Sequence, residues 1–167
     1  MPIIGRYGFT FCAAIALACA LAAPAGAELL VHKDLSLDTA NAMAEGAIAA
    51  CKERGYATSA VVVDRDGETI VSMRGDRTGP HTVENARRKA YTAMTFKQTT
   101  SEYAKKWNDG SPVVKAQVTL PSIIANPGGV PIKVGDEVIA GIGVSGSPGF
   151  DEDCINASLD KIKDQLK

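Results

Sequence analysis

The sequence predicts an α+β domain: an antiparallel sheet of about five strands with the N- and C-terminal helices packed on it, an α/β sandwich. Apolar residues recur at the helical period near both ends of the chain, and short β-branched runs lie between them. Tight turn signals join these runs in pairs, so neighbouring strands should run antiparallel. Long helices at both ends can then cover one face of the sheet.

Composition supports one globular domain. The chain has 167 residues, with 46% hydrophobic and 22% charged residues, which is typical of a folded protein and not of a disordered one. It carries 18 basic and 19 acidic residues, a net charge of −1. This near balance argues against a nucleic-acid partner.

Residues 1–27 are expected to be a secretory signal peptide. Arg6 is the only charged residue in this stretch, and the apolar run 9–23 leads to the small-residue cleavage site Ala25-Gly26-Ala27. A transmembrane anchor is the alternative, but the run is shorter than the ~18–20 apolar residues that a span needs. The mature domain would therefore comprise residues 28–167 and work in the periplasm or outside the cell.

The first half of that domain should begin with a helix at 36–54, because its apolar residues fall on one face and Gly55 stops it. The helical spacing of apolar residues then gives way to two short β-branched runs, which predict strands at 60–64 and 69–73. Arg65-Asp66-Gly67 between them predicts a tight hairpin.

Two helices are expected next. After the loop 75–80, residues 82–97 place their apolar side chains on one face. A shorter helix should start at Thr99, whose capping-box partner is Glu102, and end near Trp107.

The last part of the chain should complete the sheet. Residues 118–125 are expected to form a strand, and the turn 126–129 precedes a hairpin of strands 130–134 and 137–145. The final helix, 151–166, has an acidic first turn and basic last turns, which suits the helix dipole.

Removal of the signal peptide would leave two cysteines, Cys51 and Cys154, on the two terminal helices. An even pair in an oxidising compartment can form a disulfide, and helices side by side on one sheet face would permit it. Two buried free thiols are the alternative, because buried cysteine behaves as a small hydrophobic residue. The chain lacks C-x-x-C and C-x-x-C-H, which argues against a thioredoxin-like site and covalent c-type haem.

Gly141–Gly146 reads G-x-G-x-x-G, but its glycines lie within the last strand instead of in a turn after the first one. A dinucleotide fingerprint needs that turn. Strand glycines more often mark a close backbone approach, such as a packed helix or a subunit contact. The stretch also misses the G-x-S-x-G nucleophile elbow, and no defined acid–base pair is evident, so the sequence favours a binding protein over an enzyme.

Cationic side chains gather around His81, at Arg74, Arg77, Arg87, Arg88 and Lys89. The histidine is either a surface cap residue or an iron ligand, since neutral imidazole binds iron well. The cations are either a solvated helix face or an anion site, because guanidinium groups pair with carboxylates.

Six segments keep the order and spacing of a known family: Val63–Gly67, Arg74–Asp76, Gly79–Thr82, Ala86–Ala93, Gly128–Pro131 and Ala140–Gly146. Together they resemble the GlcG/HbpS-like haem-binding family, which includes the C-terminal domain of PduO-type proteins. The resemblance covers nearly the whole mature chain. One departure is Arg77, which follows Arg74-Gly75-Asp76 where the family usually continues Gly-Ala.

The resemblance implies a profilin-like α/β sandwich in homo-oligomers that binds haem non-covalently. For exported members it also implies haem sensing or protection against oxidative stress. We therefore expect an exported haem-binding protein, with a sensor or membrane protein as its partner. The alternatives are a haem-degrading or small-acid-metabolism accessory enzyme, and a structural protein whose haem capacity is incidental.

The expected haem site lies between Arg74 and Thr92. His81 would bind the iron, with the hydroxyls of Tyr91 and Thr92 as fallback ligands. The two propionates would pair with cations of the same stretch: Arg74, Arg77, Arg88 and Lys89.

We expect mass spectrometry of the exported protein to give an N-terminus at Glu28, because signal peptidase would cut after Ala27. An intact Met1 terminus on membrane-embedded protein would contradict this.

Overall fold

The computed structural model describes residues 2–3 and 28–166. The chain divides into two units, Met1–His32 and Lys33–Lys167, and the fold described below is that of the second. The predicted signal peptide falls almost entirely outside the described residues. Within them, no helix is both long enough and apolar enough to cross a membrane.

The sheet has four antiparallel strands in the order β2-β1-β4-β3. The central strand β1 (Ser59–Asp64) pairs with β2 (Thr69–Arg74) on one side and with β4 (Glu137–Ser145) on the other. The second edge strand, β3 (Gly129–Val134), pairs with β4. Both predicted hairpins are therefore confirmed, and β2 and β3 form the edges of the sheet.

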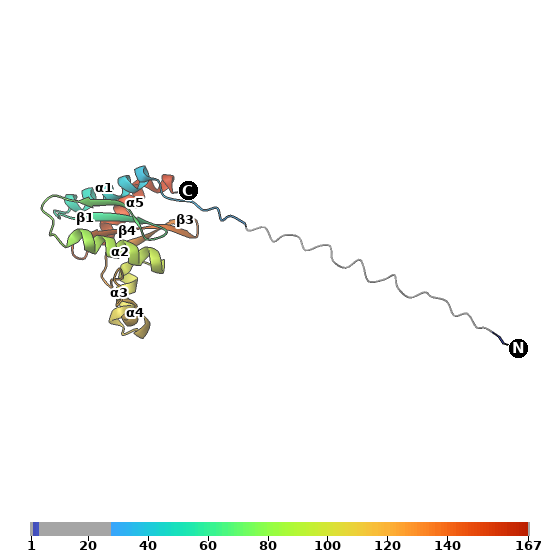
Figure 1. The fold of residues 1–167 in the computed structure, drawn as a ribbon. Coiled ribbons are helices and arrows are strands. Elements are labelled where there is room, and N and C mark those ends of the chain that lie inside the picture. The colour runs from blue at the N-terminus through green and yellow to red at the C-terminus, as the bar shows by residue number, and fades with distance from the viewer. Residues whose placement is uncertain (1, 4–27, 167) are drawn as a thin grey trace. The chain divides into compact units, whose positions relative to one another are not determined.

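Helices cover both faces of the sheet (Figure 1). The terminal helices α1 (Leu37–Glu53) and α5 (Asp151–Ile162) lie side by side on one face, as predicted. A short 3-10 turn, Lys163–Gln165, follows α5. The opposite face carries α2 (Thr82–Phe96), which packs mainly on β4 and β1. The domain is therefore a three-layer sandwich.

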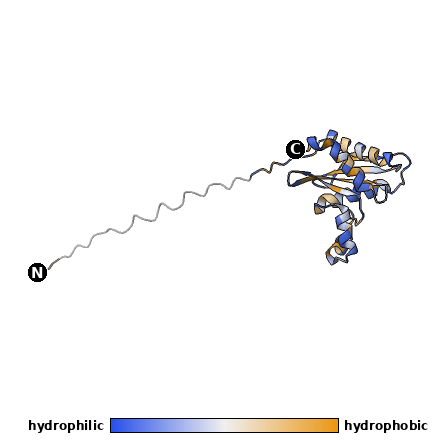
Figure 2. Ribbon diagram, turned by 180° about the vertical axis from the view of Figure 1, so that it is seen from behind, coloured by the Kyte–Doolittle hydropathy of each residue, from blue (hydrophilic) through white to orange (hydrophobic). Residues whose placement is uncertain are grey.

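The larger part of the core lies between the sheet and the terminal helices. The helix α1 contributes a face of small buried residues, which lets it approach the sheet closely: Ala40, Met43, Ala44, Ala47 and Cys51. A smaller cluster under α2 joins Val61 and Val63 to Ala86 and Ala90. Hydrophobic residues accordingly gather along the strands and the helix faces that meet them (Figure 2).

The predicted strand 118–125 is wrong. The chain instead forms a helical hairpin that projects below α2, made of α3 (Thr100–Asn108) and α4 (Pro112–Gln117), and then continues through turns to β3 (Figure 1). The apolar residues of the segment pack on this hairpin and not on the sheet, since Ile123 is buried there. The sheet consequently has four strands and not about five.

The structure joins Cys51 to Cys154 by a disulfide that links α1 to α5. Both residues are fully buried, and 103 residues separate them in sequence. The Ser147 hydroxyl lies 3.0 Å from the Cys51 sulfur and 3.9 Å from that of Cys154. The bridge therefore fastens the two terminal helices on one face of the sheet.

The glycines of β4 lie directly under α2. A Cβ atom at Gly143 would lie 2.0 Å from the carbonyl oxygen of Ala86, and one at Gly141 would lie 2.4 Å from that of Ala90. These glycines admit a packed helix, one of the two readings that the sequence left open. They are occupied within the chain, so they supply no argument for a subunit contact.

We expect Gly143→Ala to lower the free energy of unfolding by about 1–3 kcal/mol, because backbone atoms of α2 must move to admit the methyl group. Urea unfolding measures this change. Ser72→Ala, on the exposed part of β2, is the control and should unfold as the unmodified protein does. Equal midpoints for both variants would contradict the close packing.

Candidate functional site

The predicted haem-binding residues do not converge on one site. His81 lies at the N-terminal end of α2, where its side chain is exposed and makes no capping hydrogen bond. Its backbone is already helical, with φ −79° and ψ −15°. Arg88 follows two helical turns later, so His81 and Arg88 share one face of the helix.

Lys89 is buried, with 2% of its side chain exposed. Its ammonium group donates to the Asp151 carboxylate at 2.7 Å and to the carbonyl of Val144 at 3.0 Å. A Cβ at Gly128 would lie 2.8 Å from this nitrogen, so glycine there leaves room for the pair. The charge of Lys89 is thus neutralised inside the protein and is not available to a propionate.

Asp151 extends this pair into a network. Its other oxygen accepts hydrogen bonds from the backbone N–H of Ser147 at 2.9 Å and from the Ser147 hydroxyl at 2.6 Å. The same hydroxyl contacts Cys51 of the disulfide. The network therefore connects α2, on one face of the sheet, with α5 and α1 on the other.

The two fallback ligands are engaged in packing. Thr92 is buried, and its hydroxyl accepts a hydrogen bond from the backbone N–H of Ile124 at 3.0 Å. The Tyr91 ring lies against Gly67 in the β1–β2 turn. Both residues hold neighbouring segments of the chain on α2.

Arg88 lines a small cavity beside the helical hairpin, which we call the α3 pocket. The pocket encloses about 250 Å³, and every other side chain of its wall is apolar: Trp107, Val118, Ile123, Ile124 and Ala125. Arg88 donates through Nη2 to the carbonyl of Ile123 at 2.6 Å. Its Nε atom is buried and has no hydrogen-bond partner among the described residues.

The surface around the α3 pocket is polar near Arg87 and apolar on the helical hairpin. Arg87 forms an ion pair with Glu84 at 2.9 Å and reaches Ser122 at 3.5 Å. The hydrogen bonds from Arg87 hold the pKa of Glu84 below its usual value. Large hydrophobic side chains are exposed on the hairpin and just after it, among them Trp107 (37% exposed) and Leu120.

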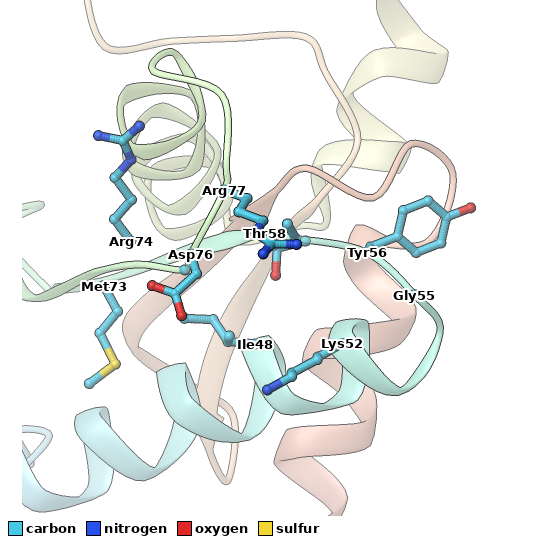
Figure 3. A pocket seen from close by; sticks show the side chains of 11 residues that line it. Ile48, Lys52, Gly55, Tyr56, Thr58, Met73, Arg74, Asp76 and Arg77 are labelled. Atoms are coloured by element: carbon cyan, nitrogen blue, oxygen red, sulfur yellow. The ribbon is translucent and has the colours of Figure 1, made fainter.

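A larger hollow of about 860 Å³, the α1–β2 pocket, opens between the end of α1 and the end of β2. Its lining includes Arg74 and Arg77, but neither His81 nor Arg88. Arg74 points away from the interior (Figure 3) and is held by Thr78, through Nε to the hydroxyl at 3.2 Å and through Nη2 to the carbonyl at 3.1 Å. Four of the predicted cations are therefore divided among two pockets and one buried ion pair.

The described residues hold no cluster of three or more His, Cys, Asp or Glu side chains that could bind a metal ion. The arginines that line the two pockets are suited to ligands with carboxylate groups.

Comparison with known proteins places the chain in a family. The family model described as "Haem degrading protein HbpS-like" matches residues 35–160. The chain belongs to the HbpS-like family. Protein GlcG of Escherichia coli K12 is 32% identical over 107 residues, which are 62% of this chain and 78% of GlcG.

Solved structures agree with this assignment. The crystal structure of HbpS has a TM-score of 0.75 and 35% identity, covering 84% of this chain and 98% of that one. A double mutant of HbpS from Streptomyces reticuli gives a TM-score of 0.76 at 35% identity, covering 87% and 98%. A complex of PduOC with haem shares the fold, with a TM-score of 0.71 at 22% identity, covering 77% and 94%.

Sequence reasoning missed most of the residues that line the two pockets. The sequence pattern marks Trp107 only as a helix end, and it places Ile123 and Ile124 in a predicted strand. Lys52 and Thr58 lie outside the 74–92 stretch, and no local pattern marked them. Arg77 was marked in the sequence, both as a candidate propionate partner and as a departure within the family resemblance.

We expect Lys89→Met to lower the free energy of unfolding by about 3–5 kcal/mol, because it leaves the Asp151 carboxylate buried without its cation. Urea unfolding measures the loss. The double variant Lys89→Met, Asp151→Asn should recover part of it, since asparagine still accepts hydrogen bonds from Ser147. If the single variant were as stable as the unmodified protein but bound haemin more weakly, Lys89 would be a propionate partner after all.

Proposed function

We propose that this chain is an exported, non-covalent haem-binding protein, and that haem binds at the α3 pocket and along the adjoining face of α2. Membership of the HbpS-like family and the likeness to PduOC, solved as a haem complex, support the choice of cofactor. The buried Cys51–Cys154 disulfide supports an oxidising compartment, where such bonds persist.

The chemistry of the wall of the α3 pocket is the main support for placing haem there. Five apolar residues surround one guanidinium group, and the Nε atom of that group is buried without a partner. Haem combines an apolar macrocycle with two carboxylates, so it matches both parts of this wall. A propionate accepting from Arg88 would satisfy the orphaned donor, and the macrocycle would cover the exposed indole of Trp107.

The α3 pocket alone cannot enclose a whole macrocycle. Its 250 Å³ lies below the ~300–1,000 Å³ of typical ligand sites. The rest of the haem would therefore lie on the outer surface of α2 and the hairpin. We propose that a second subunit of a homo-oligomer covers it there, and that a sensor or membrane protein reads the bound state.

His81 is the proposed iron ligand. It lies about 10 Å from Arg88 along the helix axis, on the same face and with its imidazole exposed. When bound, haem would supply a redox-active iron at this surface. His81 would hold that iron, while Arg88 would fix the orientation of the ring through a propionate.

The α1–β2 pocket fits haem less well, although it is larger. Its wall contains Lys52, Asp76 and Arg77, and burying these charges against a macrocycle without compensation costs free energy. We therefore leave Arg74 and Arg77 out of the proposed haem site.

Haem degradation is the second candidate function, because the family model carries that description. Binding and degradation share the site and differ in the fate of the porphyrin. Adding a reductant to the loaded protein and analysing the products separates the two. Loss of the Soret band with release of iron would favour degradation, and an intact porphyrin would favour binding.

Haemin titration of residues 28–167 should give a Soret band. Arg88→Gln should weaken haemin binding about tenfold or more, because a hydrogen bond to a charged group contributes ~1.5–3 kcal/mol. His81→Ala should shift the Soret maximum, and Trp107→Ala should weaken binding without shifting it.

Arg74→Gln is the matched control, because this cation of the predicted site is held outside the α3 pocket. Its titration should match that of the unmodified protein. An unchanged spectrum and affinity in both His81→Ala and Arg88→Gln would reject the proposed location. Absence of any Soret band would reject haem binding itself.

A further inference from the structure

The α1–β2 pocket contains a polar atom that the fold leaves unsatisfied. Thr58 is 1% exposed, and its hydroxyl is buried with no hydrogen-bond partner among the described residues. Buried hydroxyls in native proteins are almost always paired, so an exception needs an explanation such as a ligand. In Figure 3 the Thr58 hydroxyl points toward α1, across the interior of the pocket.

Two cations approach this interior from opposite walls. Lys52 projects from the last turn of α1, and Arg77 comes from the loop after β2 (Figure 3). Within the described part of the chain, neither side chain makes a hydrogen bond or an ion pair. Asp76 is the only acid of the lining, so the pocket carries a net positive charge.

The backbone at Arg77 has an uncommon conformation for a residue with a side chain. Its φ is +63°, in the left-handed region that favours glycine. Lys97 is the other described non-glycine residue with positive φ, at +54°, but it ends α2, where this conformation is common. Arg77 lies in the turn that follows β2, so an arginine occupies a backbone position that glycine adopts at lower cost.

We propose that the α1–β2 pocket binds a small organic dicarboxylate, at a site separate from the haem site. One carboxylate would pair with Arg77 and accept a hydrogen bond from the Thr58 hydroxyl, and the other would pair with Lys52. Ile48 and Met73, also in the lining, would contact the carbon chain between them. Cations on opposite walls suit two separated anionic groups better than a single phosphate.

Isothermal titration of residues 28–167 with succinate tests this. Arg77→Gly and Lys52→Gln should each weaken succinate binding at least tenfold, and Thr58→Val should weaken it severalfold. Arg77→Gly should also raise the thermal midpoint of the ligand-free protein, because glycine relieves the left-handed backbone, and this shows that the variant is folded. Acetate, with one carboxylate, should bind at least tenfold more weakly than succinate.

Lys97→Gly is the matched control, because it removes a cation at the same backbone conformation outside the pocket. It should leave succinate binding unchanged. An equal loss in Lys97→Gly, or no succinate binding at millimolar concentration, would overturn the proposal. Equally tight binding of sulfate with the same dependence on Arg77 would identify a general oxyanion site and overturn the dicarboxylate assignment.

Succinate titration in the presence of haemin separates the test of this dicarboxylate site from the test of the proposed haem-binding function. Succinate affinity that is unchanged by haemin supports two separate sites, even if the haem location suggested above proves wrong. Displacement of succinate by haemin, with haemin binding lost in Arg77→Gly, would make this pocket the haem site and overturn the inference.

Discussion

The Lys89–Asp151 ion pair is the constraint on which the rest of the domain depends. Lys89 belongs to α2 on one face of the sheet and Asp151 to α5 on the other, and they meet beside Val144 near the end of β4. A buried charge is tolerated only with its partner and hydrogen bonds in place, so the pair fixes both helices relative to the sheet. The glycine at 128 and the Ser147 contact with the disulfide belong to the same arrangement.

This constraint decides which part of α2 can serve a ligand. The face toward the sheet packs against β4 and β1 through Ala86 and Ala90, and Lys89 is committed to Asp151. Thr92 holds the segment before β3. His81 and Arg88 remain on a face that the sheet does not cover. The predicted site from Arg74 to Thr92 is therefore divided between side chains that are buried in the fold and side chains that remain exposed.

The sequence predicted the features that depend on local pattern. Helical periodicity located α1, α2 and α5, and the Asp-Gly turn located the first hairpin, because these signals reside in neighbouring residues. The prediction of a strand at 118–125 was wrong because a short apolar run does not reveal whether it packs on a sheet or on a helix. The burial of Lys89 could not be predicted for a related reason: only the tertiary packing of α2 shows that its ammonium group points inward.

The two unsatisfied polar atoms lie at two different pockets, which points to two ligand sites. Among the described residues, the buried side-chain atoms without a hydrogen-bond partner are Arg88 Nε and the Thr58 hydroxyl, and each residue lines a different pocket. Other buried polar side chains have hydrogen-bond partners, as the hydrogen bonds of Lys89 and Ser147 to Asp151 show. Because buried polar atoms in native proteins are almost always paired, a bound ligand would account for these two unpaired atoms. The walls around them differ, apolar beside Arg88 and charged beside Thr58, so the two ligands should differ in the same way.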